Sequence, residues 1–385
     1  MQRKFRKIYT LFLLCLLLFS GCSAKKGSTP SVDFSHHANG SLLTPEEITA
    51  YKNYITDTLM ITEQETALTG THTGLFSTVV SVTLYDCTDK ALLRDCFSLL
   101  AEYETVFSRT LPGSELYALN RNTAGVAQLS EPLAEAFALG LSYGDLSHHR
   151  FDISIAPLSD LWAFGSEAPT VPSPDTIKDA LTLVNGSAVT LEDRELTFPA
   201  GTRFDLGAVA KGWLADALAE YLKEHGIKSA MLNLGGNALA LGTKPDGSPY
   251  RIGITMPFSG SANLAGIVTV SDMSVVTSGI YERYFIQENT LYHHLLDATT
   301  GYPANNDLLS VTIVCKNSAL ADLLSTTCYL LGKEEGLALI HELKNRTELY
   351  ALFLTGSYDT KSGTVSNLEY HFSKGFEAAT GFTYE

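Results

Sequence analysis

The stretch that most constrains the fold is residues 204–242, which joins an amphipathic pattern, a glycine and two short apolar runs. Gly226 is placed to end the helix, and residues 227–234 after it predict a buried strand. Gly235 and Gly236 then permit a tight turn into a partner strand. The helix itself is predicted from apolar residues at three- and four-residue spacing: Ala210, Trp213, Leu214, Ala217, Leu218, Tyr221 and Leu222.

The charges at the start of this helix point to a bound anion. Asp205 stands just before the helix, and Lys211 and Gly212 lie in or beside its first turn. A cation is usually better placed at the other end, because the N-terminus carries the positive end of the helix dipole. A lysine here suits a phosphate that docks on the free backbone N–H groups. A surface lysine that only covers apolar surface is the alternative.

The charge of the chain excludes nucleic acid as a partner. With 385 residues and 45% hydrophobic content, the chain can form a sizeable core, and its formal charge is −15. Removing residues 1–21, which carry four positive charges and no negative ones, takes the charge to −19. Such a surface repels nucleic acid, and the sequence has no basic patch with interleaved aromatic residues. A phosphate-bearing ligand would need a metal ion to supply positive charge.

The first 22 residues are interpreted as a targeting signal. Basic residues at 3–7 precede the apolar run 8–19, which is too short for a typical membrane-spanning helix. Small residues directly before Cys22 resemble the bacterial lipobox, in which the cysteine is lipidated and becomes the new N-terminus. Diacylglycerol and an amide-linked acyl chain such as palmitate would then anchor the protein outside the cytoplasm. Phe19 stands where leucine is usual, and a plain secretory signal or an uncleaved anchor is the alternative.

We predict three regions: a signal peptide at 1–21, a tether at 22–66 and a globular domain at 67–385. Ser, Gly, Pro and Asn dominate the first part of the tether, as in flexible spacers. A short helix follows, with Thr44 as its cap and Pro45 in its first turn. We expect His36 and His37 to be solvated, because no further metal ligand stands near them in the sequence.

The globular domain is predicted to be α+β, because its strands and helices are interspersed without regular βαβ alternation. Outside the signal, the chain has four cysteines whose spacing fits no zinc motif. Buried free thiols are expected, although an extracytoplasmic location would permit a disulfide among Cys87, Cys96, Cys315 and Cys328.

Two stretches near the C-terminus carry residues suited to chemistry. Asp322 and Thr326 are four apart on a predicted helix and share an exposed face, with Ser325 adjacent. Oxygen ligands of this kind suit magnesium better than zinc. His294 stands three residues before Asp297, in a turn that Gly301 and Pro303 enforce. Taken alone, each stretch is also consistent with an ordinary helix start or an ordinary loop.

Seven segments together resemble one family, the FAD:protein FMN transferases, or ApbE-like flavin transferases. The resemblance covers residues 70–355 and implies a single α+β domain of two lobes, with the flavin in a cleft between them. Members are commonly bacterial lipoproteins. The segments occur in the family's order and at about its spacing: SELYALN, FDISIAPLSDLWAFG, DLGAVAKGWLAD, NLGGNALALG, TSGIYERYF, HLLDATTGYP and ADLLSTTCYLLG.

The resemblance implies a reaction and a set of site residues. FAD is cleaved at its pyrophosphate, and FMN is attached through phosphate to a threonine (or serine) hydroxyl of another protein, with AMP leaving. Magnesium would be held by the Ala208 carbonyl and by Asp322, Ser325 and Thr326. Positions against FAD are implied for Phe76, Thr110, Arg150, Phe151, Asp152, Asp205, Lys211 and Leu296.

The resemblance also implies that His294 deprotonates the incoming hydroxyl. A neutral imidazole near its ordinary pKa of about 6.5 is a suitable proton acceptor. Asp297 could orient the ring, and the adjacent His293 leaves open which ring faces the cleft.

The sequence departs from the family pattern in three places. Phe76-Ser77-Thr78 stands where Met-Gly-Thr is usual, so a hydrophobic residue is kept and the glycine is lost. Thr110 replaces a tyrosine found in many members, which could admit water and let FAD hydrolysis compete with transfer. Ala298 stands where proline is common.

Two other functions remain open at this point. One is a metal-dependent FAD pyrophosphatase that gives FMN and AMP, and the other is a flavin-binding lipoprotein without catalysis. A metal site argues against the pure carrier, since binding alone does not need one. The expected partner is an extracytoplasmic acceptor flavoprotein, such as a subunit of a membrane redox pump.

Overall fold

A nine-stranded sheet is the centre of the structure, a computed structural model that describes residues 32–260 and 263–385. The expected signal peptide and Cys22 lie outside the described residues. The sheet has the order β1-β2-β3-β7-β8-β11-β14-β15-β16, and every neighbouring pair is antiparallel. Its strands are β1 (Met60–Gln64), β2 (Ala67–Thr73), β3 (Val79–Leu84), β7 (Ser229–Leu234), β8 (Asn237–Gly242), β11 (Met273–Gly279), β14 (Leu308–Cys315), β15 (Leu349–Asp359) and β16 (Thr364–Phe372).

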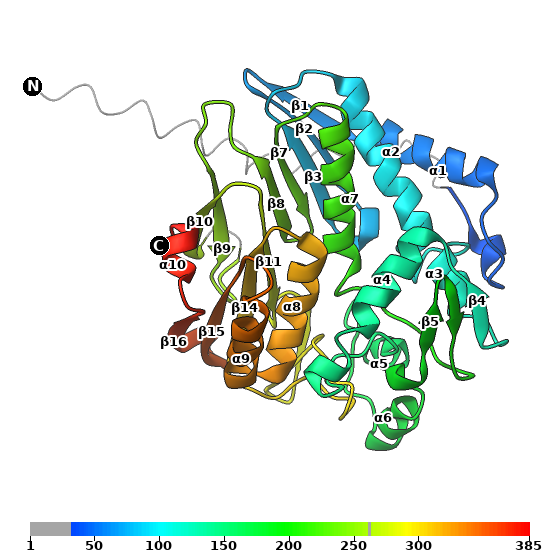
Figure 1. Ribbon diagram of the computed structural model, residues 1–385. Helices are drawn as coiled ribbons and strands as arrows, with labels where there is room; N and C mark the ends of the chain where they lie inside the picture. Colours follow the sequence, from blue (N-terminus) through cyan, green and yellow to red (C-terminus); the bar gives the residue numbers. More distant parts are fainter. Residues whose placement is uncertain (1–31, 261–262) are drawn as a thin grey trace, which may run out of the picture. The chain divides into compact units, whose positions relative to one another are not determined.

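Helices cover one face of this sheet (Figure 1). No helix among the described residues is both long and apolar enough to cross a membrane. The covering helices are α2 (Lys90–Phe107), α7 (Ala210–Glu224), α8 (Ser318–Leu331) and α9 (Lys333–Leu343), with α1 (Pro45–Asp57) packed on α2.

A smaller lobe lies beside the helical face (Figure 1). It combines short helices with a three-stranded sheet of the order β4-β6-β5. Its elements are α3 (Glu115–Leu119), β4 (Val126–Gln128), α4 (Glu131–Leu141), α5 (Ala156–Trp162), α6 (Pro174–Leu181), β5 (Thr190–Glu192) and β6 (Glu195–Thr197).

The remaining elements complete the other layer and one hairpin. A second three-stranded sheet of the order β17-β10-β9 and helix α10 share a core with strands of the large sheet. These elements are β9 (Tyr250–Thr255), β10 (Leu264–Val270), α10 (Phe376–Thr380) and β17 (Thr383–Tyr384), and the hairpin is β12 (Tyr284–Gln287) and β13 (Thr290–His293).

The structure confirms the reading of residues 204–242. Helix α7 ends where expected, and Gly226 after it has φ +81°, a left-handed conformation that glycine adopts without strain. Gly235 and Gly236, also with positive φ, link β7 to β8, which pair from Leu234 and Asn237 outward. The mixture of antiparallel sheet and helices confirms the α+β class.

The folded unit starts earlier than the expected boundary at residue 67, because it runs from Phe34 to Glu385. Helix α1 begins with the predicted cap: Thr44 and Glu47 form a reciprocal capping box, and Pro45 occupies the first turn. Phe34, Tyr51 and Ile55 are buried. These apolar contacts hold the second half of the expected tether against the domain.

The four cysteines outside the signal are free thiols, as expected. Cys96, Cys315 and Cys328 are buried, and Cys87 is half-buried. Burial raises the pKa of the Cys96 and Cys315 thiols to about 12, so both stay protonated at neutral pH.

The turn before β3 carries backbone strain at the position where the family usually has glycine. Phe76 and Ser77 have φ values of 53° and 56°, a region that favours glycine. Buried Glu104 holds this turn, because its Oε1 accepts a hydrogen bond from the Phe76 N–H at 2.8 Å. The Tyr51 hydroxyl donates to the other carboxylate oxygen at 2.5 Å.

We expect Ser77→Gly to leave the free energy of unfolding unchanged or raise it by up to about 1 kcal/mol, because relief of strain opposes the entropic cost of glycine. Ser81→Gly, within the regular strand β3, should lower it by about 0.5–1 kcal/mol. Urea unfolding of both variants tests this. Equal losses in the two variants would show that the turn at Ser77 is not strained.

Candidate functional site

The starts of helices α7 and α8 are fastened to each other. A Cβ atom on Gly212 would lie 2.2 Å from the Ser318 carbonyl oxygen, so only glycine permits this approach. Asp216 on α7 caps α8, since its two carboxylate oxygens accept from the Ser318 and Ala319 N–H groups at 2.8 and 2.9 Å. Burial raises the pKa of Asp216 to about 6, against the lowering effect of these hydrogen bonds. This contact sets the position of the next turn of α8.

Asp322 lies between the two helices. Its Oδ2 accepts from the Gly212 N–H at 3.0 Å, and its Oδ1 is 3.7 Å from Nζ of Lys211. Lys211 also donates to the Gly207 carbonyl at 2.9 Å. Asp322 is only 3% exposed, so the expectation that it stands on an exposed helix face is wrong. Oδ2 of Asp322 thus accepts the hydrogen bond that joins the two helices, and Oδ1 faces Lys211.

Three hydroxyl groups meet one turn further along α8: those of Ser325 and Thr326 on α8 and that of Ser278 on β11. Ser325 Oγ donates its only proton to the Asp322 carbonyl at 2.8 Å. In the 2.7 Å contact between Ser325 and Ser278, Ser278 Oγ is therefore the donor and Ser325 Oγ the acceptor. Ser278 has then used its proton, and Thr326 Oγ1 donates to Ser278 at 3.1 Å. The lone pairs of Thr326 stay available to a ligand. Fully buried Ser325 supports Thr326 through Ser278, and this geometry does not favour the predicted role of Ser325 as a direct metal ligand.

The turn before α7 supplies a further oxygen. Asp205 Oδ1 accepts from the Gly207 N–H at 2.9 Å and fixes the turn. In a regular helix the Gly212 N–H would donate to the Ala208 carbonyl four residues earlier, but here it donates to Asp322. Among the hydrogen bonds of the described residues, none ends on that carbonyl. Ala208 is half-buried and can offer its oxygen to a ligand.

The donor set fits a magnesium ion. Asp322 Oδ1, Thr326 Oγ1 and the Ala208 carbonyl are all oxygen donors, the type that a hard cation prefers. Magnesium also commonly keeps several waters and binds through one or two carboxylates together with substrate phosphates. These three residues therefore stay predicted ligands for the protein's share of a magnesium site.

Only one ring nitrogen of His294 has a hydrogen-bond partner among the described residues. Its Nδ1 lies 3.2 Å from the Arg283 carbonyl oxygen, and its backbone N–H donates to the same oxygen at 3.1 Å. A carbonyl can only accept, so Nδ1 carries the proton and Nε2 keeps its lone pair. His293, by contrast, is buried, with Nε2 at 3.1 Å from the Ala304 carbonyl. His294 is the ring suited to take up a proton.

The pKa of His294 is lowered to about 3, mainly by burial and then by the positive charge of Arg283, with His293 and Lys211 adding to the effect. The ring is therefore neutral at physiological pH. This corrects the expectation of a pKa near 6.5. The pKa differs from the expected value because of burial and of neighbouring cations, whose positions around His294 could not be predicted from the sequence.

Asp297 does not orient His294, contrary to expectation. Its Oδ1 accepts from the N–H and the hydroxyl of Thr299 at 2.8 and 2.6 Å, so the carboxylate shapes its own turn. The Gly301 N–H donates to the Asp297 carbonyl at 2.8 Å. The group that orients His294 is the Arg283 carbonyl, in the β11–β12 connection.

The expected flavin-contacting residues at 150–152 hold other parts of the structure. Arg150 donates to the Leu330 carbonyl at 3.1 Å, at the end of α8. Asp152 Oδ2 accepts from the Gly186 N–H at 2.8 Å, while Phe151 is buried. Their predicted contacts with FAD stay predictions. Arg150 also lines a pocket of about 370 Å³ with Asp297, Thr300, Tyr302, Pro303, Ala304, Asn305, Asn306, Leu330 and Leu331.

Leu296 is buried against Leu158, Trp162 and Ile177. The Trp162 indole N–H donates to the Gly301 carbonyl at 2.9 Å, which joins two of the family segments. The predicted contact of Leu296 with the flavin is untested. Phe76 is half-buried and Thr110 is exposed, and their cofactor contacts also stay predictions.

Three charged residues near the site were missed from the sequence. Arg109, directly before Thr110, places Nε 3.2 Å from Asp205 Oδ2. Glu282 and Arg283 lie in the recognised segment TSGIYERYF, but no local pattern shows what they face. The enclosing protein raises the pKa of Glu282 to about 7, the negative charge of Asp322 adds to this, and Lys211 opposes it. Glu282 itself keeps solvent access.

Comparison with known proteins settles the family. The model of the ApbE family matches residues 76–351. The chain belongs to the ApbE family. The resemblance seen in the sequence motifs is thereby confirmed.

Curated ApbE relatives are similar over most of the chain. The FAD:protein FMN transferase of Treponema pallidum is 36% identical over 278 residues, which cover 68% of this chain and 76% of that protein. The FAD:protein FMN transferase of Klebsiella pneumoniae is 33% identical over 276 residues, which cover 70% and 84%.

Solved ApbE structures share the fold. The flavin transferase ApbE of Vibrio cholerae gives a TM-score of 0.70 at 25% identity, over 83% of this chain and 99% of that chain. The Pseudomonas stutzeri flavinyl transferase ApbE, in its apo form, gives 0.69 at 28% identity, over 84% and 98%. The ApbE fold is thus established for this chain.

We expect the His294 ring to stay neutral from pH 8 to pH 5 in the metal-free protein. Its Cε1–H proton resonance, identified by its loss in His294→Gln, should not shift over this range. Because the unfolded chain binds a proton near pH 6.5, the folded protein should lose stability as the pH falls below that value. A titration midpoint near 6.5 in the folded protein would contradict the assigned environment.

Proposed function

We propose that this protein is a magnesium-dependent FAD:protein FMN transferase that modifies a threonine (or serine) hydroxyl of an acceptor protein and releases AMP. The observation that carries the proposal is the buried Asp322 facing Lys211, with Thr326 one turn along α8. The charge of Lys211 lowers the pKa of His294 and opposes the rise at Glu282, so these groups share one electrostatic site. Similarity to proteins named FAD:protein FMN transferase supports the same conclusion.

The reaction is a substitution at the FMN phosphorus of FAD. The acceptor hydroxyl oxygen forms a bond to this phosphorus, and the bond from the phosphorus to the oxygen shared with the AMP phosphate breaks. The hydroxyl proton passes to Nε2 of His294, and AMP leaves with the bridging oxygen. Positioning and charge neutralisation are the main contributions that a protein makes to phosphoryl transfer.

The residues of the chain divide this work. The ammonium group of Lys211, at the start of α7, attracts the pyrophosphate, and the positive end of the helix dipole adds to this attraction. Asp322, Thr326 and the Ala208 carbonyl would hold magnesium, which would neutralise charge on the pyrophosphate. His294, with its Nδ1 proton fixed on the Arg283 carbonyl, accepts the proton of the nucleophile.

The low pKa of His294 has a consequence for its role. A base with a pKa near 3 takes up a proton only transiently, so it assists while the oxygen–phosphorus bond forms. The negative charge of the incoming phosphate would favour the protonated ring at that moment. His294 is thus proposed as a general base that accepts the hydroxyl proton while the oxygen–phosphorus bond forms. The hydroxyl is not deprotonated in a separate step before attack.

We further propose that the protein acts outside the cytoplasm, anchored to the cell membrane by lipid on Cys22. The sequence from the basic segment to Cys22 supports this location. The acceptor would be an extracytoplasmic flavoprotein, such as a subunit of a membrane redox pump.

We expect full-length protein to add one FMN to such an acceptor when supplied with FAD and magnesium, and to release at least one AMP per FMN attached. Intact mass of the acceptor and chromatography of nucleotides give both values. Asp322→Asn should lower the transfer rate by at least about 10²-fold, because it removes charge from the metal site. The shape of the side chain and an acceptor for the Gly212 N–H are kept. Asp145→Asn, the same change at an exposed position, is the matched control.

Two results would contradict the proposal. Release of FMN and AMP without any gain of acceptor mass, across several extracytoplasmic flavoproteins, would identify a pyrophosphatase. Unchanged transfer by Asp322→Asn would remove this carboxylate from the metal site. Exposed Thr110, in place of the family's tyrosine, makes some hydrolysis beside transfer an expected side reaction.

A further inference from the structure

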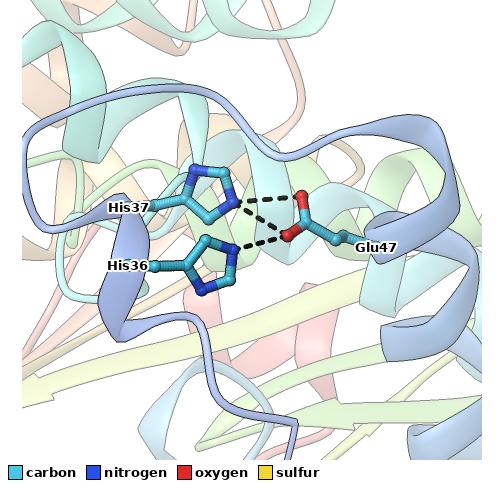
Figure 2. A group of neighbouring side chains, drawn as sticks. All are labelled: His36, His37 and Glu47. Atoms are coloured by element: carbon cyan, nitrogen blue, oxygen red, sulfur yellow. Dashed lines mark hydrogen bonds and ion pairs between the residues drawn. The ribbon is translucent and has the colours of Figure 1, made fainter.

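A second group of side chains that could ligate a metal ion lies at the start of the folded unit. Figure 2 shows His36 and His37 directed at the carboxylate of Glu47, the third helical residue of α1. His36 Nε2 is 2.7 Å from Oε1, and His37 Nε2 is 3.0 Å from both oxygens. His37 is 6% exposed, so the expectation that both histidines are solvated is wrong for it. Glu47, ten residues further along, supplies the ligand that the local sequence did not show.

The protons of this group can be placed from the hydrogen bonds. Asn39 Oδ1 accepts from the N–H and from the hydroxyl of Ser41, at 3.0 and 2.9 Å. The single hydroxyl proton of Ser41 is thereby used, so the 2.8 Å contact between Ser41 Oγ and His37 Nδ1 is donated by the histidine. In a neutral His37 the proton is then on Nδ1, and Nε2 carries a lone pair.

A lone pair on His37 Nε2 would face two carboxylate oxygens at 3.0 Å. His37 Nε2 and the Glu47 oxygens would then all be acceptors, so a proton or a metal cation must lie between them. A second proton on His37 satisfies this need and gives an ion pair. A metal cation satisfies it as well, and it also satisfies His36, whose Nε2 is directed at the same carboxylate. The arrangement of His36 at the same point favours the metal over a single proton.

The surroundings have the form that metal sites require. A ligating histidine commonly donates its other ring N–H to a fixed acceptor, and here the acceptor is Ser41 Oγ. A ligating carboxylate is commonly hydrogen-bonded too, and Glu47 Oε2 accepts from the Thr44 N–H at 2.8 Å. His37 packs against Gly113, where an added Cβ would lie 3.0 Å from its ring carbon Cγ. His37 is thus positioned by Ser41 and Gly113, and Glu47 by the Thr44 N–H.

We propose that His36, His37 and Glu47 bind a zinc ion that fastens the turn at residues 35–37 to the first turn of α1. Two imidazole nitrogens and one carboxylate form a known zinc ligand set, with the fourth tetrahedral position left to water. The three ligand atoms lie within 4.8 Å of one another. Tetrahedral ligands at about 2.0–2.1 Å from zinc are about 3.3 Å apart, so side-chain shifts of roughly half an ångström admit the ion.

This site differs from the magnesium site in chemistry. Imidazole nitrogen suits zinc and is a poor ligand for magnesium, whereas the site at Asp322 offers only oxygen. His36, with 60% of its side chain exposed, gives the ion an entry path from solvent. Zinc here would fix the segment that leads from the anchor, next to the loop that carries Gly113.

The test uses the full chain in detergent micelles with excess magnesium present to fill oxygen-only sites. Competition with a chromogenic zinc chelator should show one zinc bound per chain. Cobalt in its place should give the strong visible absorption of four-coordinate Co²⁺. Glu47→Gln should weaken zinc binding more than about 100-fold while keeping the helix cap, since glutamine also serves in a capping box. Ser41→Ala should weaken it by about 10–100-fold through the orientation of His37.

The matched control is the second pair of adjacent histidines, His148 and His149. They lie in a turn where His149 is 3.5 Å from Asp145, and the double change to alanine should leave zinc binding intact. Zinc should raise the melting temperature of wild type but not of Glu47→Gln. Equal zinc binding by wild type and Glu47→Gln would overturn the proposal. So would a wild-type melting temperature that zinc does not change, which would leave an ion pair at this position.

Discussion

The candidate site depends on one close contact, between Gly212 at the start of α7 and the Ser318 carbonyl at the start of α8. The helices can approach this far only because Gly212 has no side chain, and its N–H then reaches Asp322. Asp216 closes the contact from the other side by capping α8. Asp322, Thr326 and the turn at Ala208 take their relative positions from this contact. The proposed metal and phosphate chemistry thus depends on helix packing.

The electrostatics of the site follow from the same packing. The chain is acidic, with a formal charge of −15, yet the start of α7 presents Lys211 and a positive helix end to the site. Burial of Asp322 beside Lys211 keeps a carboxylate available for a metal ion without leaving an unpaired buried charge. Burial keeps His294 neutral, with Arg283 and then Lys211 adding to the effect, so Lys211 would serve both the proposed phosphate binding and the proposed proton transfer.

Local patterns in the sequence predicted what depends on local chemistry. The helix at 210–224, its glycine stop, the Gly235-Gly236 hairpin and the cap at Thr44 were all predicted. The errors concern contacts between distant segments. The burial of Asp322 requires Gly212, 110 positions away. The Arg283 carbonyl orients His294 because β12 and β13 pair antiparallel, which brings the residues at the open end of this hairpin together. Asp297 was misread because a carboxylate near a histidine in the sequence can bond within its own turn.

The measurement that tests this account most directly is the free energy of unfolding of Gly212→Ala, together with its magnesium requirement in transfer. Alanine in a helix interior normally adds about 1 kcal/mol of stability over glycine. Here the account predicts a loss of about 1–3 kcal/mol and a higher magnesium requirement, because the new Cβ pushes α8 away from α7. Glu220→Ala, on the exposed side of α7, should change neither. A Gly212→Ala protein that is more stable and keeps its magnesium requirement would contradict the account.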